Sequence, residues 1–183
     1  MEQNRRGENM KWYPIHVKSK QLILDLYISQ SFIQFPEAYF QVHIMEDDSI
    51  HAFWRTPLSR DVLTQVMSNV RVSLDGVTEI FQTKEYYNEI EKASPIQSAV
   101  MSNDEAQVIL KLFHDGLPEF YCDISGYDGH EYVLTIYGNY PQKLEFWCYV
   151  RPELAKVVEV INILIKKANL DAKFYGVRIS DDD

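Results

Sequence analysis

The sequence contains little cysteine, and the two cysteines that it has form no metal-binding pattern. Cys122 and Cys148 lie in segments predicted to be strands, and neither belongs to the CxxC spacing that is typical of structural zinc sites. Buried free thiols are the usual state of such isolated cysteines in proteins of the cell interior. We therefore expect neither a zinc site nor a disulfide framework.

Catalytic and cofactor-binding motifs are lacking as well. The patterns GxGxxG, GxxxxGKS/T, HExxH and GxSxG do not occur. No motif therefore supports a nucleotide-binding protein, a zinc protease or a hydrolase with a nucleophile elbow. We expect no cofactor. His43 and His51 flank a predicted hairpin tip that holds Asp47 and Asp48. Polar residues are ordinary at such a tip, and a metal needs converging ligands, so we expect no metal there.

No apolar run is long enough to cross a bilayer. The longest, residues 157–165, is interrupted by Glu159 and Asn162, and it is shorter than the roughly 20 residues that a spanning helix needs. Residues 1–10 do not contain the apolar stretch of a secretion signal. From these two features we expect a cytoplasmic protein.

Negative charge is in excess. The chain has 27 Asp and Glu against 18 Lys and Arg, which gives a formal net charge of −9. Such a chain is repelled by phosphate backbones and by anionic lipid headgroups, and no basic patch stands out beyond Arg5 and Arg6. We therefore expect neither nucleic acid nor a membrane as a partner. A negative surface instead suits a basic protein partner, because opposite charges speed association.

What the chain does contain is enough apolar surface for one folded domain. Apolar residues make up 46% and aromatic residues 13% of its 183 residues, and domains commonly span about 100–200 residues. We expect a disordered N-terminal segment at 1–9, a single domain at 10–180 and an acidic tail at 181–183.

The residue patterns predict an α+β domain. It has a mostly antiparallel sheet of five to seven strands, arranged as hairpins and a meander, with amphipathic helices packed against the sheet. Alternating apolar residues between polar turns indicate the strands. Apolar residues three and four apart, preceded by capping residues, indicate the helices. The predicted strands cover residues 11–17, 39–45, 50–56, 119–125, 130–138, 143–150 and 173–179, and the predicted helices cover 57–70, 84–93, 103–114 and 152–169.

Two segments remain open between helix and strand. Residues 20–35 alternate as a strand would, but their length and the stop at Pro36 favour a helix. Residues 70–82 favour a hairpin around Asp75-Gly76, although Gly76 is equally suited to end a helix. The segment 93–103, which is rich in serine, is predicted to be a loop.

Six residues at the turns of the predicted meander form the candidate binding site: Asp123, Tyr127, Asp128, His130, Glu131 and Tyr140. A histidine beside carboxylates is able to exchange protons as a catalytic acid or base does. However, Asp128-Gly129 is also ordinary turn chemistry, and His130 and Glu131 are also ordinary residues of a strand edge. We assign the cluster to an acidic, aromatic contact surface, because exposed tyrosines are common at protein interfaces.

Together these features favour a non-catalytic protein-binding domain that neutralises a basic partner. In size, acidity and aromatic content the chain resembles bacterial toxin-immunity proteins, a likeness of composition that no motif carries. The alternative is an enzyme that uses His130 with Asp123, Asp128 or Glu131. A third alternative is a homodimer or a component of a larger assembly. Convergence of the cluster in a concave pocket would favour the enzyme, and spread over a convex surface would favour the binder.

Overall fold

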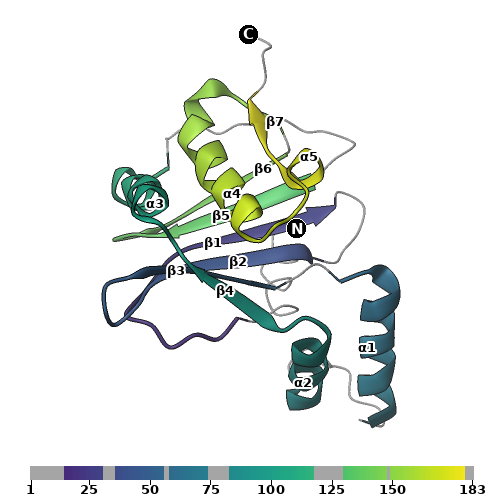
Figure 1. The fold of residues 1–183 in the computed structure, drawn as a ribbon. Helices are drawn as coiled ribbons and strands as arrows, with labels where there is room; N and C mark the ends of the chain where they lie inside the picture. Colours follow the sequence, from purple (N-terminus) through teal and green to yellow (C-terminus); the bar gives the residue numbers. More distant parts are fainter. Residues whose placement is uncertain are drawn as a thin grey trace.

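In the computed structural model, six strands form one antiparallel sheet, and two helices cover one face of it (Figure 1). The structure describes residues 15–30, 36–55, 58–73, 83–117, 130–147 and 149–179. The strand order is β4-β3-β2-β1-β5-β6, and a separate small ladder joins β7 to β8. The elements are β1 (Gln21–Gln30), β2 (Pro36–Ile44), β3 (Ile50–Arg55), α1 (Arg60–Ser73), α2 (Lys84–Ala93), β4 (Ile96–Val100), α3 (Asn103–Asp115), β5 (His130–Tyr137), β6 (Pro141–Trp147), β7 (Tyr149–Val150), the 3-10 turn η3 (Pro152–Leu154), α4 (Ala155–Lys167), α5 (Ala172–Tyr175) and β8 (Arg178–Ile179).

The predicted α+β class is confirmed, and so are its two hairpins. β2 and β3 pair around the turn at 45–49, and β5 and β6 pair around the turn at 138–140. The first strand predicted for the meander, 119–125, lies outside the described residues. The second neighbour of β5 is β1, so the two halves of the sheet meet where β1 pairs with β5.

The four predicted helices are confirmed, and α3 shows the predicted start and stop signals most fully. The Ser102 side chain accepts a hydrogen bond from the Glu105 amide, and the Glu105 side chain accepts one from the Ser102 amide. This reciprocal capping box satisfies two backbone donors that the helix itself leaves free. The helix ends at Gly116, whose φ of 76° lies in the left-handed region that favours glycine.

The helix favoured for residues 20–35 is wrong, because Gln21–Gln30 forms the central strand β1. β1 is flanked by β2 and β5, and it is buried on both faces. Leu24, Leu26 and Ile28 face the helices, while Asp25 and Tyr27 are buried on the other side. The alternation of residues 20–35 was therefore the correct signal, and the length of the segment and Pro36 were misleading, because Pro36 is the first residue of β2 and not the end of a helix.

The loop predicted at 93–103 is also wrong, because Ile96–Val100 forms the edge strand β4. β4 pairs with β3 from Arg55↔Ile96 to His51↔Val100. Its polar serine and glutamine are typical of an edge strand, which is exposed to water, and β3 supplies the hydrogen bonds that order it. No local signal in the sequence contains that information.

Three smaller expectations differ from the structure. The strand predicted at 173–179 is reduced to β8, because Asp171 caps the short helix α5 through the Lys173 amide. The hairpin strand predicted from residue 70 is wrong for residues 70–73, because α1 continues to Ser73. The predicted turn at Asp75-Gly76 lies outside the described residues. Residues 15–17, the described part of the predicted N-terminal strand, belong to no strand.

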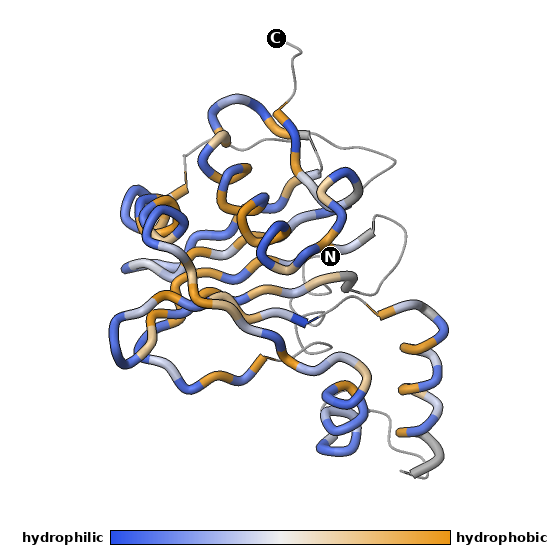
Figure 2. The backbone as a smooth tube through the Cα atoms, viewed as in Figure 1, coloured by the Kyte–Doolittle hydropathy of each residue, from blue (hydrophilic) through white to orange (hydrophobic). Residues whose placement is uncertain are grey.

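The main core lies between the sheet and helices α3 and α4, and apolar residues gather there in Figure 2. Burial of a large apolar side chain is worth about 1.5–3 kcal/mol. Helix α4, which carries the predicted apolar band, is therefore a principal source of stability. Its buried side chains are Val157, Val158, Val160, Ile161, Leu164 and Ile165.

Helices α1 and α2 form an insertion in the β3–β4 hairpin and lie beside the sheet rather than on it (Figure 1). They share a small core of their own, made of Leu63, Val66, Val70, Tyr86 and Ile90. At the base of the insertion, Arg55 is only 4% exposed. Its guanidinium donates to the Ser94 carbonyl and lies 2.6 Å from the Glu91 carboxylate. This clamp ties the helical pair to the end of β3.

Candidate functional site

The structure separates the two predicted site residues that begin β5. His130 pairs with Gln30 of β1, and it faces the helices, where its ring centroid lies 5.1 Å from that of Tyr175. Glu131 is the next residue of the strand, so its side chain points to the opposite face of the sheet. The two groups therefore do not converge.

Tyr140, the other predicted residue that the structure describes, lies far from His130. Tyr140 is 84% exposed in the turn after β5, and the seven residue steps from His130 to Tyr137 span about 23 Å at 3.3 Å each. Asp123, Tyr127 and Asp128 lie outside the described residues. Of the three predicted residues that the structure describes, Tyr140 has the exposure that a contact surface needs.

The second face of the sheet, opposite α3 and α4, carries a buried carboxylate that the sequence analysis did not single out. Asp25, in the middle of β1, is 1% exposed. The Tyr137 hydroxyl donates a hydrogen bond to Asp25 Oδ2 at 2.7 Å, whereas Oδ1 makes no hydrogen bond to a described residue. Burial raises the pKa of Asp25, and interactions with Tyr137, Thr135 and Lys143 oppose that rise only in part.

A chain of hydrogen bonds continues from this carboxylate along β2. Gln41 Nε2 donates to the Tyr39 hydroxyl at 2.8 Å, and His43 Nε2 lies 3.0 Å from Gln41 Oε1. Because an amide oxygen only accepts, His43 carries its proton on Nε2, and its Nδ1 accepts from the Ser19 hydroxyl at 2.7 Å. Burial lowers the pKa of His43, which agrees with this neutral tautomer.

We refer to Ser19, Asp25, Tyr39, Gln41, His43 and Tyr137 as the Asp25 network. Burial raises the pKa of both tyrosines, which therefore stay protonated, and the charge of Asp25 raises them further. A carboxylate with a raised pKa is suited to acid catalysis where a substrate can reach it. At 1% exposure Asp25 is closed to a reacting atom. The network instead fixes β1, β2 and β5 in register through paired buried groups.

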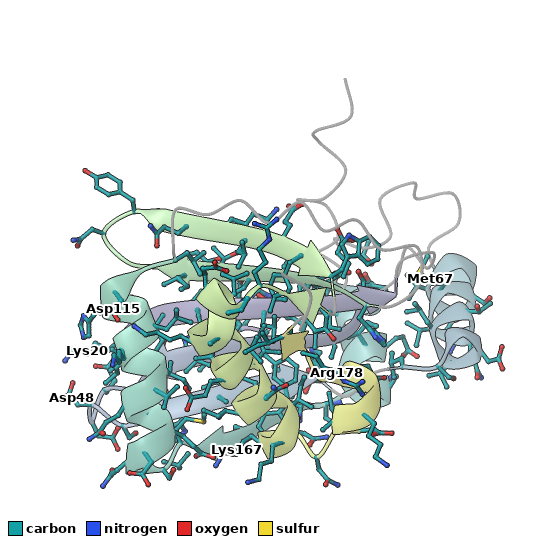
Figure 3. The ribbon with its side chains drawn as sticks, turned by 90° about the horizontal axis from the view of Figure 1, so that it is seen from above. Lys20, Asp48, Met67, Asp115, Lys167 and Arg178 are labelled. Carbon is teal, nitrogen blue, oxygen red and sulfur yellow. The ribbon has the colours of Figure 1, made fainter. Side chains whose placement is uncertain are left out.

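The polar residues at the tip of the β2–β3 hairpin have structural partners. His43 and His51 lie directly opposite each other, as predicted. Asp47 accepts hydrogen bonds from the Ser49 hydroxyl and amide, and Asp48 pairs with Lys20 at 2.5 Å (Figure 3). Within the described part of the chain, no group of three or more histidines, cysteines and carboxylates is arranged to hold a metal ion.

Several basic side chains form ion pairs with carboxylates, and some of these pairs join neighbouring elements. Lys156 of α4 pairs with Asp115 of α3 at 2.6 Å, and Lys167 pairs with Glu105 of α3 at 2.7 Å. Further pairs are Lys20–Asp48, Arg55–Glu91, Lys92–Glu89 and Lys143–Glu145. Because basic side chains are the minority in this chain, such pairing leaves the acidic residues in excess.

Comparison with known proteins adds no relative. No family model, curated protein or solved structure matches the chain. The helices among the described residues are all too short or too polar to cross a bilayer. Function must therefore be argued from the molecule's own surfaces.

A hollow of about 420 Å³ lies beside the C-terminal end of α4. Lys166 and Arg178 line it together with amide and apolar side chains, and no carboxylate does. Asn162 forms one wall, where its side chain binds both the amide and the carbonyl of Val177 at 3.3 Å. Both cations are exposed to solvent, so the hollow is a shallow surface feature rather than an enclosed pocket.

Proposed function

We propose that the protein is a non-catalytic binding protein and that it binds a basic protein in the cytoplasm, as an immunity or inhibitor protein does. The observation that carries the proposal is the separation of His130 and Glu131, the two predicted catalytic groups that the structure describes. His130 and Glu131 point to opposite faces of β5, and Tyr140 stands at the other end of the β5–β6 hairpin. Groups on opposite faces of a sheet do not reach one substrate atom, so the surface is better suited to contact than to acid–base chemistry.

The distribution of charge supports a basic partner. The segments 74–82, 118–129 and 180–183 contain eight acidic and no basic residues, and so they carry most of the net charge of −9. The described residues are nearly balanced in charge, and ion pairs join many of them. A concentrated excess of negative charge attracts a basic protein and repels nucleic acid and anionic lipid.

The test is retention of partners on the immobilised full chain from a cell extract, followed by mass spectrometry. Ionic strengths of about 0.01 M and 0.15 M give Debye lengths of about 30 Å and 8 Å. We expect one basic protein to be retained at low salt and more weakly at high salt. Retention that does not depend on salt, or no retained protein, would contradict the proposal and move an enzymatic function to first place.

Two charge reversals of the same size test where the partner binds. Asp128→Lys lies in the predicted contact surface, and Glu159→Lys lies on the exposed face of α4. Each changes the net charge equally. We expect Asp128→Lys to slow association with the retained basic protein several-fold at low salt and Glu159→Lys to slow it much less. Equal slowing by the two variants would assign the attraction to net charge and not to this surface.

A further inference from the structure

β4 differs from the strand at the other edge of the sheet because none of its own residues is charged. β4 reads Ile-Gln-Ser-Ala-Val, and among the strands that the structure describes only β3 pairs with it (Figure 1). The other edge strand, β6, begins at Pro141 and carries the Lys143–Glu145 ion pair at 2.6 Å. Proline and charge are the usual protection of an exposed edge against addition of another strand, and β4 itself contains neither.

The hydrogen-bond register of β4 determines which backbone groups face outward. The Met101 amide donates to the Ile50 carbonyl at 2.8 Å, which makes these two residues a hydrogen-bonded pair. Such pairs alternate along an antiparallel ladder, so Ala99 and Gln97 also bond to β3. The amides and carbonyls of Val100, Ser98 and Ile96 therefore point away from the sheet. The Ile96 amide confirms this direction, because it reaches the Glu91 carboxylate at 3.4 Å.

We propose that β4 is a self-association edge, where it pairs antiparallel with β4 of a second copy about a two-fold axis at Ser98. In this register Ser98 lies opposite Ser98 of the second copy, and Ile96 lies opposite its Val100. The two serines exchange two backbone hydrogen bonds. Each Val100 amide donates to the Ile96 carbonyl across the axis, which adds two more, while Glu91 keeps the Ile96 amide. Four backbone hydrogen bonds then join two sheets into one.

The side chains of β4 suit a second copy better than a charged partner. Ile96, Ser98 and Val100 share one face of the strand, and Val100 is 58% exposed. The two-fold register places each Val100 against Ile96 of the other copy. One contact therefore covers the exposed Val100 side chains of both copies. Two chains of net charge −9 repel each other, so a strand without charged residues of its own is where they meet at least electrostatic cost. The Glu91 carboxylate at the Ile96 end of the edge is paired with Arg55.

This pairing has a salt dependence opposite to that of a basic partner. Added salt screens repulsion between the two copies, so dimerisation is strengthened between about 0.01 M and 0.15 M ionic strength. Binding of a basic protein is weakened over the same range. The two associations are therefore distinguishable, and either proposal can fail without the other.

The experiment is analytical ultracentrifugation of the full chain over a series of protein concentrations and at both salt concentrations. We expect an apparent mass that rises with concentration from 21.5 kDa toward twice that value, and more steeply at high salt. Ser98→Pro removes an amide that faces outward and leaves the bonds between β3 and β4 in place. We expect it to weaken dimerisation about tenfold or more, because the central pair of hydrogen bonds is lost.

Val100→Lys is the second variant, because it places a charge at the contact without touching the backbone. Val62→Lys is its matched control, since Val62 is an exposed valine of α1, away from the β4 edge. We expect Val100→Lys to weaken the dimer by a similar factor and Val62→Lys to leave it unchanged. A mass of 21.5 kDa at every concentration, or a dimer that Val100→Lys and Val62→Lys affect equally, would overturn the proposal.

Discussion

At the scale of single residues, Asp25 is the group whose environment departs most from that of an ordinary surface carboxylate. It is buried in the middle of a central strand, where the Tyr137 hydroxyl donates a hydrogen bond to it at 2.7 Å. Its pKa is raised, so the folded protein binds more protons than the unfolded chain at pH values between the unfolded and folded pKa. Stability must therefore fall as the pH rises through that interval.

Asp25→Asn removes this dependence while it keeps an oxygen that accepts from Tyr137. At acidic pH, below its raised folded-state pKa, the carboxyl is neutral, and we expect wild type and variant to have similar stability. At pH 7 we expect the variant to be more stable by roughly 1 kcal/mol, because a buried charge is replaced by a neutral group. Urea unfolding at a series of pH values measures the difference.

The control for this prediction is Glu159→Gln, which neutralises an exposed carboxylate of α4. We expect Glu159→Gln to change the free energy of unfolding at pH 7 by less than about 0.5 kcal/mol, as is usual for a surface substitution. If Asp25→Asn is less stable than wild type at pH 7, then the ionised Asp25 is held by stronger interactions than the single bond from Tyr137.

At the residue level, the orientation of a side chain is readable only where its strand is recognised. The segment 130–138 was predicted as a strand, and that alone implies opposite faces for His130 and Glu131, although the sequence analysis grouped the two in one contact surface. Tyr39, Gln41 and His43 alternate within another predicted strand, so their shared face was also readable. Asp25 was not, because its neighbourhood depends on β1, which was assigned to a helix.

At the scale of elements, the two misassigned segments have opposite causes. β1 is buried on both faces, with Asp25 buried like its apolar neighbours, so its long and largely apolar sequence also fits a buried helix. β4 is so exposed that its composition is that of a loop. In both cases the neighbouring strands supply the order, and a single sequence read locally does not contain that contribution. Helices α3 and α4 were predictable because their caps and apolar periodicity are local.

The inserted pair α1–α2 is expected to unfold independently of the sheet when its clamp is removed. Arg55→Met leaves the fully buried Ser94 without the donor to its carbonyl, which costs about 1–3 kcal/mol. We expect faster hydrogen exchange in α1 and α2, measured by mass spectrometry, and unchanged exchange in β1 and β5.

Lys92→Met is the matched control for Arg55→Met. Lys92 also pairs with a carboxylate of α2, but its side chain is 72% exposed, and exposed pairs contribute about 0–1 kcal/mol. We expect little change in exchange. Equal acceleration across the whole sheet in Arg55→Met would show that the inserted helices and the sheet unfold as one unit.

At the scale of the whole molecule, the net charge of −9 influences both proposed associations in opposite directions. It attracts a basic partner, and it opposes the approach of a second copy to β4. The charge is unevenly placed along the chain, since Asp181, Asp182 and Asp183 alone contribute three negative charges. A change confined to this tail therefore alters the long-range field without altering β4.

Replacement of Asp181, Asp182 and Asp183 by asparagine is expected to weaken binding of the basic partner and to strengthen the β4 dimer. The association rate constant with the retained basic protein should fall several-fold at about 0.01 M ionic strength and less than about twofold at 0.15 M, because salt screens the lost attraction. Over the same range the β4 dimer should become tighter, with the larger gain at low salt. Stopped-flow kinetics and ultracentrifugation measure the two effects on one variant. A variant that weakens both associations would mean that the tail makes direct contacts, since a loss of net negative charge alone cannot weaken the pairing of two negatively charged copies.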